Sequence, residues 1–197
     1  MFDVDSRRQV LVTVKYDNGV EKSFECDYLI APLIRKLNEN RLYTRYCCSS
    51  HEDERFLDMY IYFSRFDYEG NEELDDKLNY LMVNSKKYFD FEHDYRLGIW
   101  TTAWGRRMHL KDPTVKDLDL ATKLAFKEDF DDVFFITKDG RIKVRKEYRK
   151  YIDKTVTFRT KLSAKRNTRD SDEFTEENYE FVMEGVNRLN ELLRNYR

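Results

Sequence analysis

A run of alternating residues near the start of the chain limits its fold more than any other feature. Residues 9–15 read QVLVTVK, in which valines recur at every second position, and this period is typical of a strand with one buried face. The tripeptide DNG at residues 17–19 supplies the positive φ that a tight turn needs, and EKSFEC follows at residues 21–26. The segment therefore predicts a two-stranded antiparallel hairpin.

Helical and extended patterns alternate through the rest of the chain. Apolar residues at helical spacing predict helices at 28–38, 72–88 and 114–128 and after Thr175. Asp27 is expected to cap the first helix, and Pro32 is tolerated there because it lies in the first turn. Strands are expected within 42–48, 56–64, 95–104, 132–146 and 154–162. This order predicts an α+β fold, with about four helices packed on a mixed or antiparallel sheet and an amphipathic helix at the C-terminal end.

The length of the chain favours one compact domain. A chain of 197 residues is long enough to bury a core, to which 14 Phe and 14 Tyr contribute bulky apolar surface. Only 2 Pro and 6 Gly are present, and no linker divides the chain cleanly. We therefore expect a single α+β domain over residues 1–197, with residues 133–173 as a basic sub-lobe.

Charge is distributed unevenly along the sequence, although the net charge is only −2. Residues 51–94 hold 13 Asp and Glu against 5 Lys and Arg, whereas residues 138–169 hold 13 Lys and Arg against 3 Asp and Glu. Two interpretations stay open. The two charged faces attract each other within the chain or between subunits of a homo-oligomer, or the basic segment forms a surface for phosphates, including those of RNA.

The cysteines and the apolar runs indicate the compartment. Three cysteines are too few for a disulfide scaffold, and adjacency disfavours a bridge between Cys47 and Cys48. The first residues lack the basic-then-apolar pattern of a signal peptide, and no apolar run approaches membrane-spanning length. We expect a reduced, cytoplasmic protein without membrane contact.

The stretch CCSSH at residues 47–51 gathers scarce reactive side chains. Cys48 and His51 have a spacing that could bind one metal ion, but the other cysteines and histidines form no second close pair, so no metal site is expected. A Cys48–His51 nucleophile would lack an orienting third group. The remaining interpretations are a strand that ends in a turn, with one cysteine facing the core, or a turn whose hydroxyl and N–H groups bind a phosphate. The residues proposed for that binding turn are Thr44, Arg45, Cys48, Ser49, Ser50 and His51.

The same stretch resembles a known motif. Over residues 27–63, the pattern T-x-x-x-C-S-S-H is similar to the Cys-Ser-Gly-Arg motif of the tRNA wybutosine-synthesis methyltransferase family, and to a Cys-Ser-Gly-His version in small bacterial and phage proteins. Thr44, Cys48 and Ser49 match, whereas Ser50 replaces the glycine and His51 replaces the arginine. The resemblance covers about one fifth of the chain and implies methylation of a tRNA base with S-adenosylmethionine as cofactor. We retain from it a nucleotide-like ligand. No cofactor is expected, except S-adenosylmethionine under the methyltransferase alternative.

Aromatic and basic residues are combined in two further segments. Residues 98–110 hold both tryptophans beside two arginines and a histidine, a set that can stack a base and pair with its phosphate or, alternatively, anchor a core. The ligand-binding candidates there are Trp100, Trp104, Arg106, Arg107 and His109. Residues 138–169 interleave basic residues with aromatic ones, which is typical of a nucleic-acid face or a phosphate-rich pocket, although strand alternation explains much of this pattern.

The sequence analysis leads to three function hypotheses and names no catalytic residue. The first is a binder of a nucleotide-derived small molecule, in the form of a phage-type anti-defence sponge that sequesters a signalling nucleotide. The second is an RNA- or nucleotide-modifying enzyme of the methyltransferase type. The third is an interaction protein that pairs its acidic and basic faces. Phosphate-loop and two-histidine phosphoesterase motifs are absent from the sequence, so no reaction is selected.

Overall fold

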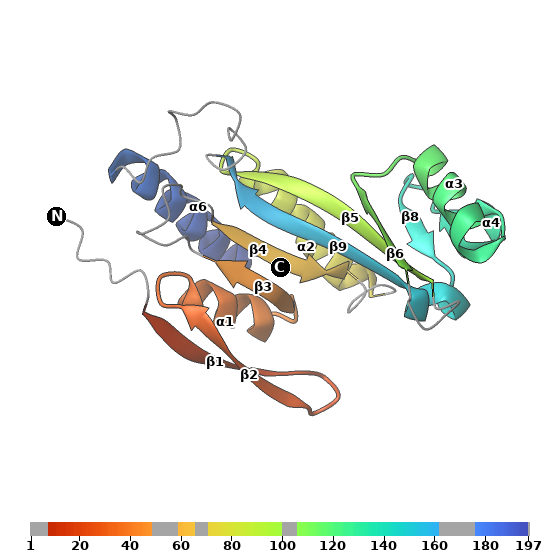
Figure 1. Ribbon diagram of the computed structural model, residues 1–197. Helices are drawn as coiled ribbons and strands as arrows, with labels where there is room; N and C mark the ends of the chain where they lie inside the picture. Colours follow the sequence, from red (N-terminus) through yellow and green to blue (C-terminus); the bar gives the residue numbers. More distant parts are fainter. Residues whose placement is uncertain (1–7, 49–58, 66–70, 100–105, 162–175, 197) are drawn as a thin grey trace. The chain divides into compact units, whose positions relative to one another are not determined.

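The computed structural model describes residues 8–48, 59–65, 71–99, 106–161 and 176–196 (Figure 1). In chain order, the elements are β1 (Gln9–Lys15), β2 (Glu21–Asp27), α1 (Ala31–Glu39), β3 (Thr44–Cys48), β4 (Tyr60–Ser64), α2 (Glu72–Ser85), β5 (Phe89–Ile99), β6 (Arg106–Lys111), α3 (Val115–Phe126), α4 (Phe130–Val133), β7 (Phe134–Ile136), β8 (Ile142–Val144), the 3₁₀ helix η2 (Lys146–Tyr151), β9 (Ile152–Thr160) and α6 (Glu176–Asn195). The predicted α+β fold class is confirmed.

The strands form one larger sheet and two hairpins. The larger sheet is antiparallel, with the strand order β3-β4-β9-β5-β6, while β1 pairs with β2 and β7 pairs with β8. The order places β9, which comes late in the sequence, between the early strands β4 and β5. Residues far apart in the sequence are thereby brought onto neighbouring strands.

The chain divides into two compact units that are interleaved in the sequence. Unit 1 comprises residues 1–63, 71–91 and 157–197, and unit 2 comprises residues 64–70 and 92–156. Strands β5 and β9 each contribute residues to both units. The expected single domain with a basic sub-lobe at 133–173 stays a prediction.

Unit 1 begins with the predicted hairpin. Strands β1 and β2 pair in antiparallel register from Gln9 opposite Asp27 to Lys15 opposite Glu21, and Gly19 occupies the turn with φ +78°. Glycine adopts such a φ without steric cost, so the DNG signal identified the turn correctly. Helix α1 packs against β1, and α6 contacts both α1 and α2.

Helix α1 starts later than the sequence analysis predicted. Asp27 ends β2, and the residue at the N-cap position is Ile30, which makes no side-chain capping bond. Pro32 in the first turn favours a start directly before it, because proline has a helical φ and no N–H to satisfy. The prediction that Asp27 caps this helix is therefore wrong.

Unit 2 has a core of its own around Phe134. The core residues come from β5, α3, α4, β7, β8 and β9: Tyr95, Leu97, Leu118, Ala121, Phe130, Val133, Phe134, Val144 and Ile152. Helix α3 begins with the predicted capping box, in which Thr114 and Asp117 bond to each other's backbone N–H. The predicted hairpin at Asp139-Gly140 is also present, with Gly140 at φ +79°. Residues 130–133 form the short helix α4 instead of the start of the expected strand.

Candidate functional site

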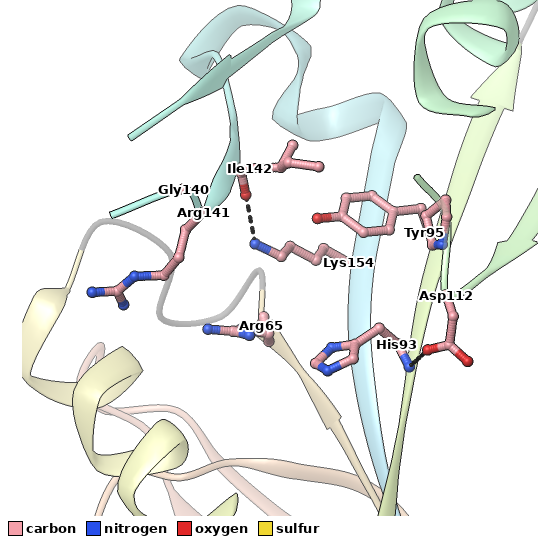
Figure 2. Close-up of a pocket in the computed structure, with 9 residues that line it drawn as sticks. Arg65, His93, Tyr95, Asp112, Gly140, Arg141, Ile142 and Lys154 are labelled. Carbon is pink, nitrogen blue, oxygen red and sulfur yellow. Dashed lines mark hydrogen bonds between the residues drawn. The ribbon is translucent and has the colours of Figure 1, made fainter. Parts of the chain in front are cut away.

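A pocket of about 340 Å³ lies within unit 2. We call it the cationic pocket, and its lining residues are Arg65, His93, Tyr95, Asp112, Pro113, Gly140, Arg141, Ile142 and Lys154. They come from the end of β4, from β5 and β9, from the segment after β6 and from the β7–β8 hairpin. Figure 2 shows the Tyr95 hydroxyl, the Lys154 ammonium and the His93 ring projecting from their strands toward a common space.

Lys154 is the best-defined cation of the pocket. Its side chain is only 9% exposed, and its Nζ donates a hydrogen bond of 2.8 Å to the carbonyl oxygen of Ile142 (Figure 2). The same Nζ lies 5.8 Å from the ring centroid of Tyr95, within the range of a cation–π contact. The carbonyl and the ring therefore help to hold the ammonium in place.

Arg65 and His93 add a second cation and a titratable ring. Arg65 directly follows β4 and is 7% exposed. His93 lies on β5, and its pKa is lowered below 6.5, first because burial disfavours the charged ring and second because the guanidinium of Arg65 repels it; Asp112 opposes this shift. The surroundings of His93 therefore disfavour the protonated form of its ring.

Asp112 fixes the end of the β5–β6 pair. The backbone N–H of His93 donates to Asp112 Oδ1 over 2.7 Å, and the backbone N–H of Asp112 donates to the carbonyl of His93. Asp112 has φ +44°, a conformation in which aspartate is among the more tolerant residues. This double connection positions the backbone of His93 at the pocket wall.

The β7–β8 hairpin contributes a cation that already has a carboxylate partner. The guanidinium of Arg141 pairs with Asp139, and hydrogen bonds from Thr137 and then Arg141 lower the pKa of Asp139 to about 2. Arg141 is therefore already ion-paired within the hairpin. Arg65 and Lys154 are the buried cations of the lining. Tyr95, Pro113 and Ile142 supply apolar surface beside them.

The predicted binding turn begins in unit 1, away from the residues of this pocket in the sequence. Thr44, Arg45 and Cys48 lie on β3, whereas Ser49, Ser50 and His51 are outside the described residues. Thr44 is 6% exposed, and Asn38 bonds to both its backbone N–H, at 3.1 Å, and its hydroxyl, at 3.0 Å. These contacts join α1 to β3, which gives Thr44 a structural role.

The second predicted group belongs to β5 and β6 of unit 2. Trp100 and Trp104 lie outside the described residues, while Arg106 and Arg107 pair across the strands with Ile99 and Gly98. His109 lies beside Asp94, with 3.0 Å between Nε2 and Oδ2. Of the predicted site residues that the structure describes, none lines the cationic pocket.

Sequence reasoning found part of the pocket and missed the rest. The basic segment 138–169, predicted to contact phosphates, contributes Arg141 and Lys154. Arg65 stands in an acidic stretch, and His93 forms no close pair with another histidine or cysteine in the sequence. No local motif marks either residue, because the pocket arises from the insertion of β9 between β4 and β5.

Cys47 of the CCSSH stretch lies beside the third cysteine of the chain. The Sγ atoms of Cys26 on β2 and Cys47 on β3 are 3.6 Å apart. The pKa of Cys47 is raised, first by its hydrogen bond with Cys26 and then by burial. Cys48 is the last residue of β3, and the turn predicted after it lies outside the described residues. Across the residues with described positions, no three His, Cys, Asp or Glu side chains gather in a way that could hold a metal ion.

Two wider findings complete the description of the site. Within the described ranges, no helix combines the length and apolar character that crossing a membrane requires. No protein-family model matches the chain, and neither the curated proteins nor the solved structures include a significant match.

Proposed function

We propose that this protein binds a small nucleotide-derived molecule and holds its phosphate in the cationic pocket. The observation that carries the proposal is the burial of two cations, Arg65 and Lys154, in the wall of one pocket. Lysine and arginine are rarely buried to this degree. A pocket that gathers two such side chains holds several N–H donors that can bind an anion.

The chemistry of the lining favours a phosphate with an organic group attached. A guanidinium and an ammonium are the two cationic donors that proteins use for phosphate oxygens. Tyr95, Pro113 and Ile142 offer apolar surface on which a sugar or base can rest. Such a combination of apolar walls with a few convergent polar groups is typical of small-molecule sites.

The size of the pocket favours a small molecule over a nucleic-acid chain. Small-molecule sites occupy roughly 300–1,000 Å³, and the cationic pocket, at about 340 Å³, lies at the lower end of that range. This volume suits one nucleotide unit. RNA contact along the whole basic segment 138–169 would instead require an extended face with many phosphate contacts.

We further propose that the ligand is held without being converted, as in a sponge that sequesters a signalling nucleotide. This part of the proposal rests on the absence of a recognised catalytic motif from the sequence. The methyltransferase-type alternative requires S-adenosylmethionine, so it makes a separate prediction for the same binding assay.

The test is a calorimetric titration of purified protein with a defined panel: the four 5′-nucleoside monophosphates, their 3′,5′-cyclic forms, ADP-ribose and S-adenosylmethionine. At least one phosphorylated member should bind to the wild-type protein. Lys154→Met should weaken that binding about tenfold or more, since a charge-assisted hydrogen bond is lost. The matched control is Lys138→Met, which removes an exposed lysine outside the pocket lining.

The outcomes separate the hypotheses. Binding that both lysine variants leave unchanged would contradict the assignment of the pocket, provided that circular dichroism shows both variants folded. Recovery of a modified ligand after incubation, detected by mass spectrometry of the released material, would favour the enzyme alternative. Binding of S-adenosylmethionine alone would favour the methyltransferase type.

A further inference from the structure

We infer that Cys26 and Cys47 form a redox pair, which a disulfide oxidant such as oxidised glutathione converts reversibly into a disulfide that joins β2 to β3. The pair belongs to unit 1 and is independent of the ligand proposed for the cationic pocket. Three observations support the inference: the contact between the two sulfur atoms, the alternation of side chains along β3, and the separate sheets to which β2 and β3 belong.

The two sulfur atoms are already in contact. The Sγ atoms of Cys26 and Cys47 lie 3.6 Å apart, and both residues carry free thiols. A disulfide bond is about 2.05 Å long, so the sulfur atoms must approach each other by only about 1.5 Å. Cys26 Sγ also donates to the carbonyl oxygen of Asp27 over 3.6 Å, which helps to hold this thiol in place at the contact.

Cys47 is selected as the partner over its neighbour Cys48. Both residues lie on β3, where successive side chains point to opposite faces of the strand. The register with β4 is regular at these two positions, with Cys47 opposite Ile61 and Cys48 opposite Tyr60. Because Cys47 faces Cys26, the side chain of Cys48 is directed to the other face. The chain thus provides a matched comparator one residue away from the proposed pair.

A disulfide at this position would connect two sheets. Strand β2 pairs with β1 in the N-terminal hairpin, whereas β3 pairs with β4 at the edge of the larger sheet. The 20 residues between Cys26 and Cys47 include the whole of α1. Closing a loop of this size lowers the conformational entropy of the unfolded chain and thereby favours the folded state. Oxidation should therefore stabilise the arrangement of the hairpin, α1 and β3.

The reaction is an exchange in two steps. Cys47 is half-buried and Cys26 is only 2% exposed, so Cys47 reacts first. Its thiolate attacks one sulfur of glutathione disulfide, whose S–S bond breaks and releases one glutathione. Cys26 then loses its proton and attacks the Cys47 sulfur of the mixed disulfide, which releases the second glutathione. The two protein thiols lose two electrons and two protons, and glutathione disulfide takes them up to become two glutathione thiols.

The position of equilibrium is the quantity to measure, because the exchange should be slow near neutral pH. The hydrogen bond with Cys26, and then burial, raise the pKa of Cys47, and only a thiolate attacks a disulfide. Full-length wild-type protein is therefore held at pH 8 in mixtures of reduced and oxidised glutathione until its composition no longer changes. The same mixtures with urea provide the unfolded reference.

The first arm of the test counts bridged peptides. After an acid quench and blocking of free thiols with N-ethylmaleimide, trypsin separates Cys26 from Cys47, since Arg35 lies between them, and mass spectrometry detects the joined peptides. The equilibrium constant for the Cys26–Cys47 disulfide should be about tenfold to a hundredfold larger in the folded protein than in urea. The oxidised protein should also unfold at a temperature about 5–10 °C higher than the reduced protein.

The second arm compares the adjacent cysteines. Cys48→Ser should keep the bridge with an unchanged equilibrium constant. Cys47→Ser should lose it, with any Cys26–Cys48 bridge at least about tenfold less favourable, because the strand directs Cys48 away from Cys26. If Cys47→Ser does not fold, the wild-type protein and Cys48→Ser still decide the result.

Several outcomes would overturn the inference: glutathione adducts or disulfide-linked dimers without the intramolecular bridge, a Cys26–Cys48 bridge as abundant as the expected one, or equal equilibrium constants in the folded protein and in urea. None of them affects the proposed function, because Lys154-dependent binding is measured with all three cysteines kept reduced.

Discussion

At the scale of single residues, Asn38 shows how a buried polar group organises unit 1. Its side chain donates to the Ile34 carbonyl at 2.7 Å and to the Thr44 hydroxyl, and it accepts the backbone N–H of Thr44. Asn38→Ala leaves that buried N–H without its partner, so we expect a loss of roughly 1–3 kcal/mol in the free energy of unfolding. Urea denaturation followed by circular dichroism measures it. A loss below about 0.5 kcal/mol, typical of surface substitutions, would contradict this role.

His93 should make the stability of the free protein depend on pH. Its pKa in the folded state is lowered from 6.5, so the unfolded chain binds more protons while the pH lies between about 6.5 and the folded pKa. Stability should therefore be highest above about pH 6.5 and decrease as the pH drops toward the folded pKa. The urea midpoints of the wild-type protein and of His93→Asn, measured from pH 5 to pH 8, should converge at low pH. Parallel curves would exclude this contribution of His93.

The difference between Thr44 and Lys154 explains what the sequence could reveal about the site. Thr44 matched a motif, yet its contacts with Asn38 serve the packing of α1 on β3. Lys154 stood in a basic stretch whose period-two pattern has an equally good structural explanation. Neither the motif nor the pattern indicates how deeply a side chain is buried. Burial is what distinguishes Lys154 from the exposed lysines around it.

At the scale of elements, Gly185 allows α6 to pack closely against Tyr88 and Phe89. A Cβ atom at this position would lie 3.0 Å from Tyr88 Cβ and 3.1 Å from Phe89 Cζ. Tyr88 Cβ can move only with its backbone, and the Phe89 ring is buried. Overpacking costs about 1–3 kcal/mol, whereas alanine gains about 1 kcal/mol of helix propensity over glycine.

We therefore expect Gly185→Ala to destabilise the protein by about 1 kcal/mol in urea denaturation, and Gly185→Val to destabilise it more. The control is Asn187→Ala at an exposed position of the same helix, where only propensity acts and stability should be unchanged or slightly higher. Stabilisation by Gly185→Ala would show that the Phe89 ring gives way easily.

The junction of β2 and β3 should suppress the reactivity of a cysteine. The pKa of Cys47 is raised by its hydrogen bond with Cys26 and by burial, and only the thiolate is nucleophilic. At pH 7.5, iodoacetamide should modify Cys47 at least about tenfold more slowly in the folded protein than in urea. Cys26→Ala removes the main cause and should restore part of the rate. Fragment masses of the peptide separate Cys47 from Cys48, and labelling at the unfolded rate would contradict the prediction.

Elements with a strong local signal were predictable. The DNG and Asp139-Gly140 turns and the Thr114 capping box are local signals, because each depends on residues only a few positions apart. Local signals failed where two of them competed. Asp27 is a good capping residue, but it also ends β2 in register with Gln9, and the paired strand determined its position.

At the scale of the whole molecule, the site depends on chain order more than on sequence pattern. Arg65, His93 and Lys154 are separated by 28 and 61 residues in the sequence, and they meet because β9 lies between β4 and β5. No single-sequence rule predicts that insertion, since it depends on long-range pairing. The α+β fold class was predicted correctly, yet the pocket could not be located from the predicted elements.

The two cores should respond separately to substitution. Leu37 is fully buried on α1 in unit 1, and Phe134 is fully buried in the core of unit 2. Leu37→Ala should cost about 2–5 kcal/mol and Phe134→Ala about 3–5 kcal/mol. If each unit opens on its own, hydrogen exchange followed by mass spectrometry should show faster exchange in β1, β2 and α1 for Leu37→Ala, and in β6, α3 and β7 for Phe134→Ala. Leu120→Ala, which removes an exposed leucine of α3, is the control and should change neither set. Faster exchange throughout the chain in both core variants would instead establish a single cooperative domain, as the length of the chain predicts.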